Sequence, residues 1–398
     1  MKKISFLLAL VILLTGCTGI HASETTVSTT VSPETTVVPD TTAVPETTAV
    51  PETTAPETVP ETTAPDPMEY LLSTLTTEEK VGQLFLARCP DVDALEDIST
   101  YHLGGYILFG RDFENQTPDT VSKTISGYQA QAHIPMLIAV DEEGGNVCRV
   151  SSFSAFRESR FPSPRSLYDL NGMNAIQETE TEKCQLLRSL GINVNMAPVC
   201  DITTNPQAFM YNRSLGQSPE ITGTFVQTVV SLMADHQVGS VLKHFPGYGE
   251  NADTHVGIAT DSRSLEALEQ HDLLPFSAGI QAGCDAILVS HTIVECLDQE
   301  VPASLSPAVH QYLRNEMGFQ GVIVTDDLVM QAITDQYGAG EAAVLAVLSG
   351  NDLLCSSDYR TEYPAVLSAV EEGRIPEDIL DQAVLRILRW KQELGLIL

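Results

Sequence analysis

The chain has 398 residues, of which 53 are acidic and 21 are basic, giving a formal net charge of −32 at pH 7. It has no basic stripe that could release counterions from phosphates, so the composition argues against nucleic acid as a partner. Such acidity suits solubility outside the cell and a neutral or cationic partner.

The first residues have the pattern of an export signal. Lys2 and Lys3 precede an apolar run over residues 6–14 that is too short to span a membrane comfortably. The run ends in LTGC, and small residues directly before a cysteine resemble the lipobox of bacterial lipoproteins. We therefore predict a signal peptide over residues 1–17, lipidation at Cys17, and a position on the extracellular face of the membrane. An ordinary secretory signal cut nearby is the alternative.

Residues 18–66 repeat variants of PETTAVPETTAP and contain no lysine or arginine. Such a segment cannot bury a core, so we predict a disordered linker. Proline at this density favours polyproline II, which would let the linker hold a domain on the order of 150 Å from its anchor.

The remaining residues, 67–398, are predicted to form one domain of alternating strands and helices. Thr76 and Glu79 form a capping-box pattern that begins a helix. Continuous apolar runs, typical of parallel strands buried on both faces, follow at 81–88, 104–109, 135–140, 192–199, 239–242, 286–290, 321–325 and 352–355. Helical patterns lie at 221–235, 264–282, 305–317, 340–348 and 380–394. Eight such units predict an α/β fold, a single (β/α)8 TIM-type barrel; a doubly wound open sheet is the alternative.

Polar residues follow five of the predicted strands directly. They are Asp141, Asp201, the pair Lys243 and His244, His291, and the pair Asp326 and Asp327. A single polar residue could cap a strand end, but five strands ending this way are hard to explain structurally. Because all strands of a barrel share one carboxyl-end rim, we expect the active site there.

Two groups of residues suggest catalysis before any family is considered. Asp253 and His255 can meet in a tight loop, where a carboxylate would fix the imidazole tautomer and make His255 a general acid/base. A surface Asp–His pair is the alternative. Asp326 could equally be a helix N-cap, or Asp327 could be the N-cap while Asp326 is the nucleophile. Asp141 and Arg149 could form a structural ion pair.

KHFPGYGENADTH, residues 243–255, resembles the loop of glycoside hydrolase family 3, in its β-N-acetylglucosaminidase branch. Five further segments resemble other motifs of that family in the same order: LSTLTTEEKVGQLF, VDEEGGNVCRV, INVNMAPVCDI, YNRSLG and GVIVTDDLVM. The resemblance covers roughly residues 68–397. It departs at Tyr248, where the family usually has histidine, and the loop is one residue shorter.

The resemblance implies a role for each matching residue. Asp326 would be the nucleophile that forms a covalent glycosyl–enzyme intermediate, and His255 the general acid/base oriented by Asp253. Residues implied to bind the substrate are Asp141, Arg149, Arg213, Lys243 and His244. Asp327 would support the nucleophile, and Asp201 and His291 would line the rim.

The physical chemistry agrees with these roles. Retaining glycosidases commonly use two carboxyl groups about 5–5.5 Å apart. In this branch a histidine replaces the second one, which spares the site a pair of like charges. The β-glucosidase branch takes its acid/base from a second α/β sandwich domain, for which we find no room in this sequence.

We therefore expect a retaining exo-β-N-acetylglucosaminidase that removes terminal β-linked N-acetylhexosamine. Its expected partners are β-N-acetylglucosaminyl glycans, either muropeptides from peptidoglycan or chitin-type oligosaccharides. We expect membrane contact through the lipid anchor only, a monomer, no cofactor and no metal. The seven cysteines after Cys17 are predicted to be buried free thiols.

Three alternatives remain at this stage. A histidine acid/base would let phosphate approach the intermediate, which would give a phosphorylase. Lys243 could be the Schiff-base lysine of an aldolase-type barrel. The third alternative is a non-catalytic surface glycan-binding protein.

Overall fold

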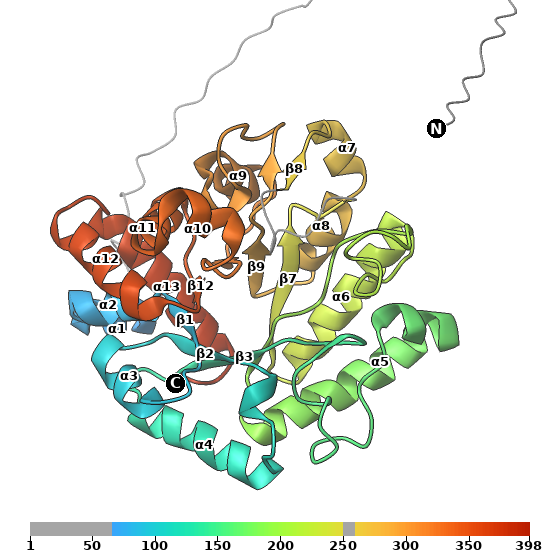
Figure 1. Cartoon of the computed structure of the whole chain (residues 1–398), viewed down its shortest axis with the longest axis horizontal. Helices are drawn as coiled ribbons and strands as arrows, with labels where there is room; N and C mark the ends of the chain where they lie inside the picture. The colour runs from blue at the N-terminus through green and yellow to red at the C-terminus, as the bar shows by residue number, and fades with distance from the viewer. Residues whose placement is uncertain (1–65, 250–258) are drawn as a thin grey trace, which may run out of the picture. The chain divides into compact units, whose positions relative to one another are not determined.

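The computed structural model describes residues 66–249 and 259–398, in which parallel strands are surrounded by helices (Figure 1). The barrel strands are β1 (Phe85–Arg88), β2 (Gly105–Leu108), β3 (Leu137–Val140), β6 (Val194–Asn195), β7 (Gly239–Phe245), β9 (Ala286–Val289), β11 (Val322–Thr325) and β12 (Leu354–Ser356). They pair in the order β11-β9-β7-β6-β3-β2-β1-β12, and every pairing is parallel.

A parallel bridge between Val324 and Leu353 joins the two ends of this order. The amide of Thr325 also donates to the carbonyl of Leu353 at 3.0 Å. Because both end strands have a partner, the sheet closes into a barrel. The prediction of a (β/α)8 barrel is confirmed, and the open-sheet alternative is wrong.

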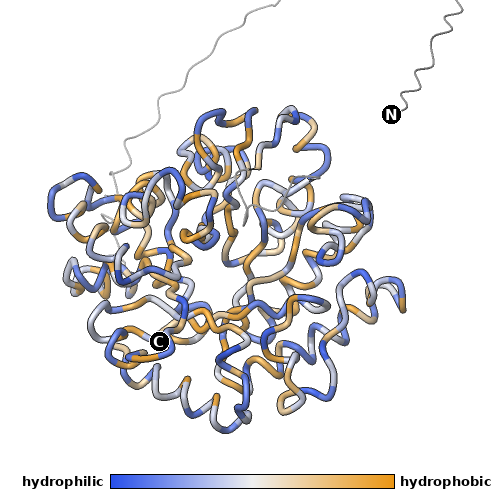
Figure 2. Tube along the Cα trace, viewed as in Figure 1, coloured by the Kyte–Doolittle hydropathy of each residue, from blue (hydrophilic) through white to orange (hydrophobic). Residues whose placement is uncertain are grey.

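The helices surround the strands. They are α1 (Pro67–Thr74), α2 (Thr77–Gln83), α3 (Ala94–Tyr101), α4 (Pro118–Gln131), α5 (Pro164–Leu190), α6 (Pro219–Asp235), α7 (Leu265–Gln270), α8 (Leu273–Gln281), α9 (Pro307–Gln311), α10 (Gln331–Tyr337), α11 (Ala339–Ser349), α12 (Tyr359–Glu371) and α13 (Glu377–Glu393). Figure 2 shows hydrophobic and hydrophilic segments alternating along outer helices such as α4 and α5. All residues of β2, β3, β9 and β11 are buried, as their continuous apolar runs predict.

Three predicted strands differ clearly from the structure. The one expected over 192–199 is only β6, Val194–Asn195. Residues 81–83 belong to helix α2, because the Thr76–Glu79 capping box starts a helix that runs to Gln83. Strand β7 continues to Phe245, so Lys243 and His244 lie within the strand rather than after it.

Two predicted helices are also interrupted. The one expected over 264–282 breaks at His271, whose backbone angles are φ −133° and ψ −79°, and is therefore two helices, α7 and α8. The one expected over 305–317 begins as α9 and continues as a π-helical turn, Tyr312–Glu316.

Several predictions concern residues outside the described ranges. Residues 1–65 include Cys17 and nearly all of the expected linker, and residues 250–258 include Asp253 and His255. The segment boundaries 1–17, 18–66 and 67–398 therefore stay predictions. Over residues 66–249 and 259–398, no helix is long and apolar enough to cross a membrane. The cysteines there are all free thiols; Cys296 is partly exposed, and the other six are buried as expected.

Candidate active site

A cavity of about 750 Å³ opens at the carboxyl ends of the barrel strands. It brings together all of the predicted site residues that lie within the described ranges: Asp141, Arg149, Arg213, Lys243, His244 and Asp326. These residues therefore lie together at the rim where the active site is expected. Asp253 and His255 lie outside the described residues.

Lys243, on β7, is the centre of the charged wall of this cavity. Its Nζ lies 2.7 Å from Oδ1 of Asp141 and 2.6 Å from Oε1 of Glu143. Burial disfavours its ammonium, but the two carboxylates outweigh that effect and raise the pKa of Lys243. A lysine held in its charged form is a poor amine nucleophile, so the structure argues against the Schiff-base alternative.

Glu143 is a site residue that the sequence analysis missed. Its carboxylate receives two hydrogen bonds from Arg213, at 2.7 and 2.9 Å, in addition to the contact with Lys243. Burial opposes ionisation, yet these two cations hold the pKa of Glu143 far below its usual range. The signal was present in the sequence: Asp141 and Glu143 are two residues apart in an extended segment, which places their side chains on one face.

Asp141 links the network to Arg149. The guanidinium of Arg149 lies 3.5 Å from Oδ2 of Asp141. Burial opposes ionisation of Asp141, but Lys243 and Arg149 together lower its pKa. A continuous row of alternating charges results, running through Arg149, Asp141, Lys243, Glu143 and Arg213.

Arg149 is presented by a short hairpin of β4 (Glu142–Gly144) and β5 (Val147–Cys148). The fully buried carboxylate of Glu142 accepts hydrogen bonds from the backbone amides of Arg149 and Val150, at 2.8 and 2.7 Å. Asn195, on β6, accepts from the Glu142 amide at 2.9 Å and so ties the hairpin to the barrel. Glu142 is a second positioning residue that the sequence analysis did not single out.

His244 is held in one tautomer. Its Nδ1 lies 2.7 Å from Oδ2 of Asp201, and its Nε2 lies 3.1 Å from a guanidinium nitrogen of Arg213. Arginine can only donate, so Nε2 accepts and Nδ1 carries the proton. Asp201 also accepts from the Tyr248 amide at 2.7 Å. Asp201 therefore orients His244. Contrary to expectation, it does not itself line the cavity.

Asp326 follows strand β11 directly and faces the cavity. Its amide donates to the Val289 carbonyl at 3.1 Å, and its Oδ1 accepts from the Asp327 amide at 2.9 Å. The N-cap alternative is wrong for both acids, because α10 is preceded by Met330 as its N-cap.

Asp327 supports the strand end that carries Asp326. Its carboxylate accepts from the amide and the hydroxyl of Ser357, at 3.1 and 2.5 Å, which ties the end of β11 to the end of β12. His291 is fully buried and its Nε2 lies 3.0 Å from the Asp327 carbonyl. His291 thus supports this turn, and it is not among the residues that line the cavity.

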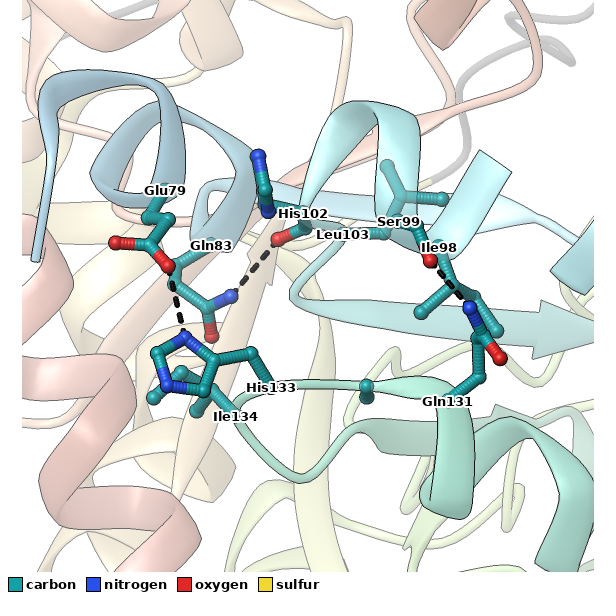
Figure 3. A pocket seen from close by; sticks show the side chains of 10 residues that line it. Glu79, Gln83, Ile98, Ser99, His102, Leu103, Gln131, His133 and Ile134 are labelled. Carbon is teal, nitrogen blue, oxygen red and sulfur yellow. Dashed lines mark hydrogen bonds and ion pairs between the residues drawn. The ribbon is translucent and has the colours of Figure 1, made fainter. Parts of the chain in front are cut away.

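A smaller pocket of about 160 Å³ lies near the opposite ends of strands β1 to β3 (Figure 3). His133 lies 2.8 Å from Glu79 there, and Gln83 donates to the His102 carbonyl at 2.8 Å (Figure 3). It shares no residue with the first cavity and has no comparable row of charges. Within the described ranges, no group of three or more His, Cys, Asp or Glu side chains is arranged to hold a metal ion.

A carboxylate among fixed charges, at the carboxyl-end mouth of a (β/α)8 barrel, is an arrangement that glycoside hydrolases use. Residues 76–390 match the family model described as "Glycosyl hydrolase family 3 N terminal domain". The chain therefore belongs to glycosyl hydrolase family 3 and is a glycoside hydrolase, as its motifs predict.

Two curated relatives are named for the same kind of activity. The β-hexosaminidase LpqI of Mycobacterium tuberculosis is 31% identical over 331 residues, which cover 80% of this chain and 83% of that protein. The β-hexosaminidase of Xanthomonas axonopodis pv. citri is 35% identical over 245 residues, covering 61% of this chain and 71% of that protein.

Solved structures of similar fold support the same family. A glycoside hydrolase family 3 β-N-acetylglucosaminidase from Paenibacillus sp. str. FPU-7 superposes with a TM-score of 0.75 at 35% identity, over 81% of this chain and 63% of that one. The structure of M. tuberculosis LpqI gives a TM-score of 0.74 at 29% identity, over 81% of this chain and 96% of that one.

Proposed function

We propose that this protein is a retaining exo-β-N-acetylglucosaminidase that releases terminal β-linked N-acetylhexosamine. The observation that carries the proposal is the gathering of Asp326 with the five predicted substrate-binding residues in one cavity. The names of the relatives, β-hexosaminidase and β-N-acetylglucosaminidase, support the same substrate class.

The charged wall suits a neutral sugar with several hydroxyl groups. Arg149, Arg213 and Lys243 can donate hydrogen bonds to hydroxyl oxygens, and Asp141 can accept from a hydroxyl group. These side chains already hold one another in place, so they need little reorganisation when the sugar enters. The sugar would therefore be fixed with its anomeric carbon beside Asp326.

In the first step, the carboxylate of Asp326 attacks the anomeric carbon and the bond to the leaving oxygen breaks. His255, oriented by Asp253, gives its proton to that oxygen, and a covalent glycosyl–enzyme intermediate remains. In the second step, His255 takes a proton from water as the water attacks the same carbon. The carboxylate of Asp326 leaves, and the sugar is released with its β configuration retained.

The natural substrate follows from the expected location. A lipid at Cys17 and an extended linker over residues 18–66 would place the barrel outside the cell, beside peptidoglycan. We therefore propose peptidoglycan fragments as the source of the sugar, and a monomeric barrel held by its anchor. Replacing Cys17 with alanine should move the protein from the membrane fraction to the medium, and light scattering of the barrel should give the monomer mass.

The experiment that tests the activity compares nitrophenol release from aryl β-N-acetylglucosaminide and aryl β-glucoside, with wild type and Asp326→Ala. We expect a strong preference for the N-acetyl substrate that is lost in the mutant. Each reaction is run with and without phosphate, and a rate that rises with phosphate would indicate a phosphorylase. Inactivity of the wild type on both sugars would overturn the proposal in favour of glycan binding.

A further inference from the structure

Arg263 lies outside the row of charges described above, and none of the motif assignments includes it. Its guanidinium binds two carboxylates: it lies 2.6 Å from Asp261 and 2.5 Å from Asp272. Both carboxylates are nearly inaccessible, with side chains 3% and 1% exposed. Two buried carboxylates side by side need a cation, so Arg263 holds this cluster together.

The cluster lies directly against the turn that leaves strand β7. Gly247 and Gly249 both have positive φ angles, +121° and +56°. A Cβ on Gly249 would lie 2.7 Å from the guanidinium of Arg263, and one on Gly247 would lie 2.7 Å from the side chain of Asp272. The glycines therefore let the backbone approach the cluster more closely than any other residue would.

The cluster also holds the chain where the described residues resume after position 258. Asp261 lies in β8 (Thr260–Asp261), which pairs with β10 (Ile293–Val294). The amide of Ile293 donates to the Ala259 carbonyl at 2.9 Å, which fixes this segment to the barrel. The guanidinium of Arg263 thus packs against the backbone of Gly249, directly before the interval, and binds Asp261, shortly after it.

We infer that Arg263 is a positioning residue for the acid/base step. By packing against the backbone directly before residues 250–258 and binding two carboxylates after them, it sets where the chain carrying Asp253 and His255 leaves and re-enters the barrel. This inference rests on the proposed function, since it takes His255 as the proton donor. Arg263 itself does not line the cavity that contains Asp326.

The test measures kcat/KM, which reports the step in which the leaving group departs. Two β-N-acetylglucosaminides are compared: a phenyl glycoside, which needs a proton donor, and a dinitrophenyl glycoside, which does not. We expect Arg263→Met to lower kcat/KM for the phenyl glycoside about 10- to 100-fold, because small displacements of a general acid are costly. The dinitrophenyl glycoside should lose less than about threefold.

A double-mutant cycle separates positioning from general damage. In a His255→Ala background, Arg263→Met should cause almost no further loss on the phenyl glycoside, because the group that it positions is already gone. Arg263→Lys should restore only part of the activity, since an ammonium cannot bind both carboxylates as the planar guanidinium does.

The matched control is Arg374→Met. Arg374 also contacts a carboxylate through two nitrogens, that of Glu341, but at an exposed pair on the outer helices. It should leave both substrates unchanged. An equal loss on both substrates for Arg263→Met, or losses that multiply in the double mutant, would overturn the inference while leaving the proposed function standing. A wild type inactive on both glycosides would overturn both.

Discussion

Lys243 and Glu143 form an ion pair of 2.6 Å between side chains that are 3% and 1% exposed. Each also binds a second partner, Asp141 or Arg213, so no charge in the pair is left uncompensated. The pair therefore fixes the direction of the groups that are proposed to meet the sugar.

Glu143→Gln should destabilise the fold and impair binding together. Removing one partner leaves Lys243 and Arg213 buried with too little negative charge, which should cost about 3–5 kcal/mol of unfolding free energy. Urea denaturation measures this loss. The control is Glu182→Gln, since Glu182 pairs with Arg157 and its side chain is 54% exposed. That substitution should cost less than about 1 kcal/mol, and an equal cost for both would contradict the account.

Asp201→Asn should weaken substrate binding by freeing the His244 ring. The carboxylate accepts from Nδ1 of His244 and thereby leaves Nε2 as an acceptor for Arg213. An amide can present its NH2 group to Nδ1 and favour the other tautomer. Loss of a hydrogen bond to a charged group should lower kcat/KM by about tenfold or more. The kcat/KM of Asp201→Asn is compared with that of Asn205→Ala, a substitution in the loop that follows Asp201. A wild-type kcat/KM in Asp201→Asn would show that the tautomer does not matter.

Stability should depend on pH through Glu362, which is fully buried in α12. Neither of its carboxyl oxygens makes a hydrogen bond of good geometry. Burial is the main cause that raises the pKa of Glu362 to about 8, although the nearby Ser356 hydroxyl acts in the opposite direction. Folding favours the protonated form, so its contribution is complete below about pH 4 and is lost as pH rises through about 8. Glu362→Gln should therefore stabilise the fold more at pH 9 than at pH 5, as urea denaturation at both pH values would measure. An equal effect at both would rule out the raised pKa.

Lys391 should produce the opposite slope. It is fully buried in α13, and burial lowers its pKa to about 7; its Nζ donates to Gln83 at 2.6 Å. The unfolded chain binds this proton more tightly, so stability should rise between about pH 7 and pH 10. Lys391→Met should flatten that rise in thermal melts, while Lys123→Met on exposed α4 should not. A slope unchanged by Lys391→Met would contradict the lowered pKa.

Much of the fold could be predicted because its strands are buried on both faces. Each such strand leaves a continuous apolar run in the sequence, and all eight were found at nearly the right place. The predicted strand ends were wrong where the end depends on side-chain contacts and not on the apolar pattern. The polarity of Lys243 and His244 predicts a strand that ends before them, yet in the structure both lie within β7, where Glu143 pairs with Lys243 and Asp201 accepts a hydrogen bond from His244.

The candidate site divides in the same way. Residues proposed to meet substrate, such as Asp326 and Arg149, could be assigned from motifs. Residues that work through others could not, since Glu142 and Glu143 are identified by contacts with chain segments distant in sequence. Asp201 is a similar case. The sequence predicts that it lies at the end of a strand, but the direction of its carboxylate depends on contacts with the backbone of Tyr248 and with His244.

The row of charges at the barrel mouth has a consequence for salt dependence. Among the described residues, four cations balance four carboxylates, so this part of the cavity wall is formally neutral even though the whole chain carries −32: Arg88, Arg149, Arg213 and Lys243 against Asp141, Glu143, Asp326 and Asp327. A neutral sugar entering it changes no net charge and releases no counterions. Ionic strength should thus affect how quickly a charged aglycone reaches the mouth, while the sugar itself is held equally well in dilute buffer and in brine.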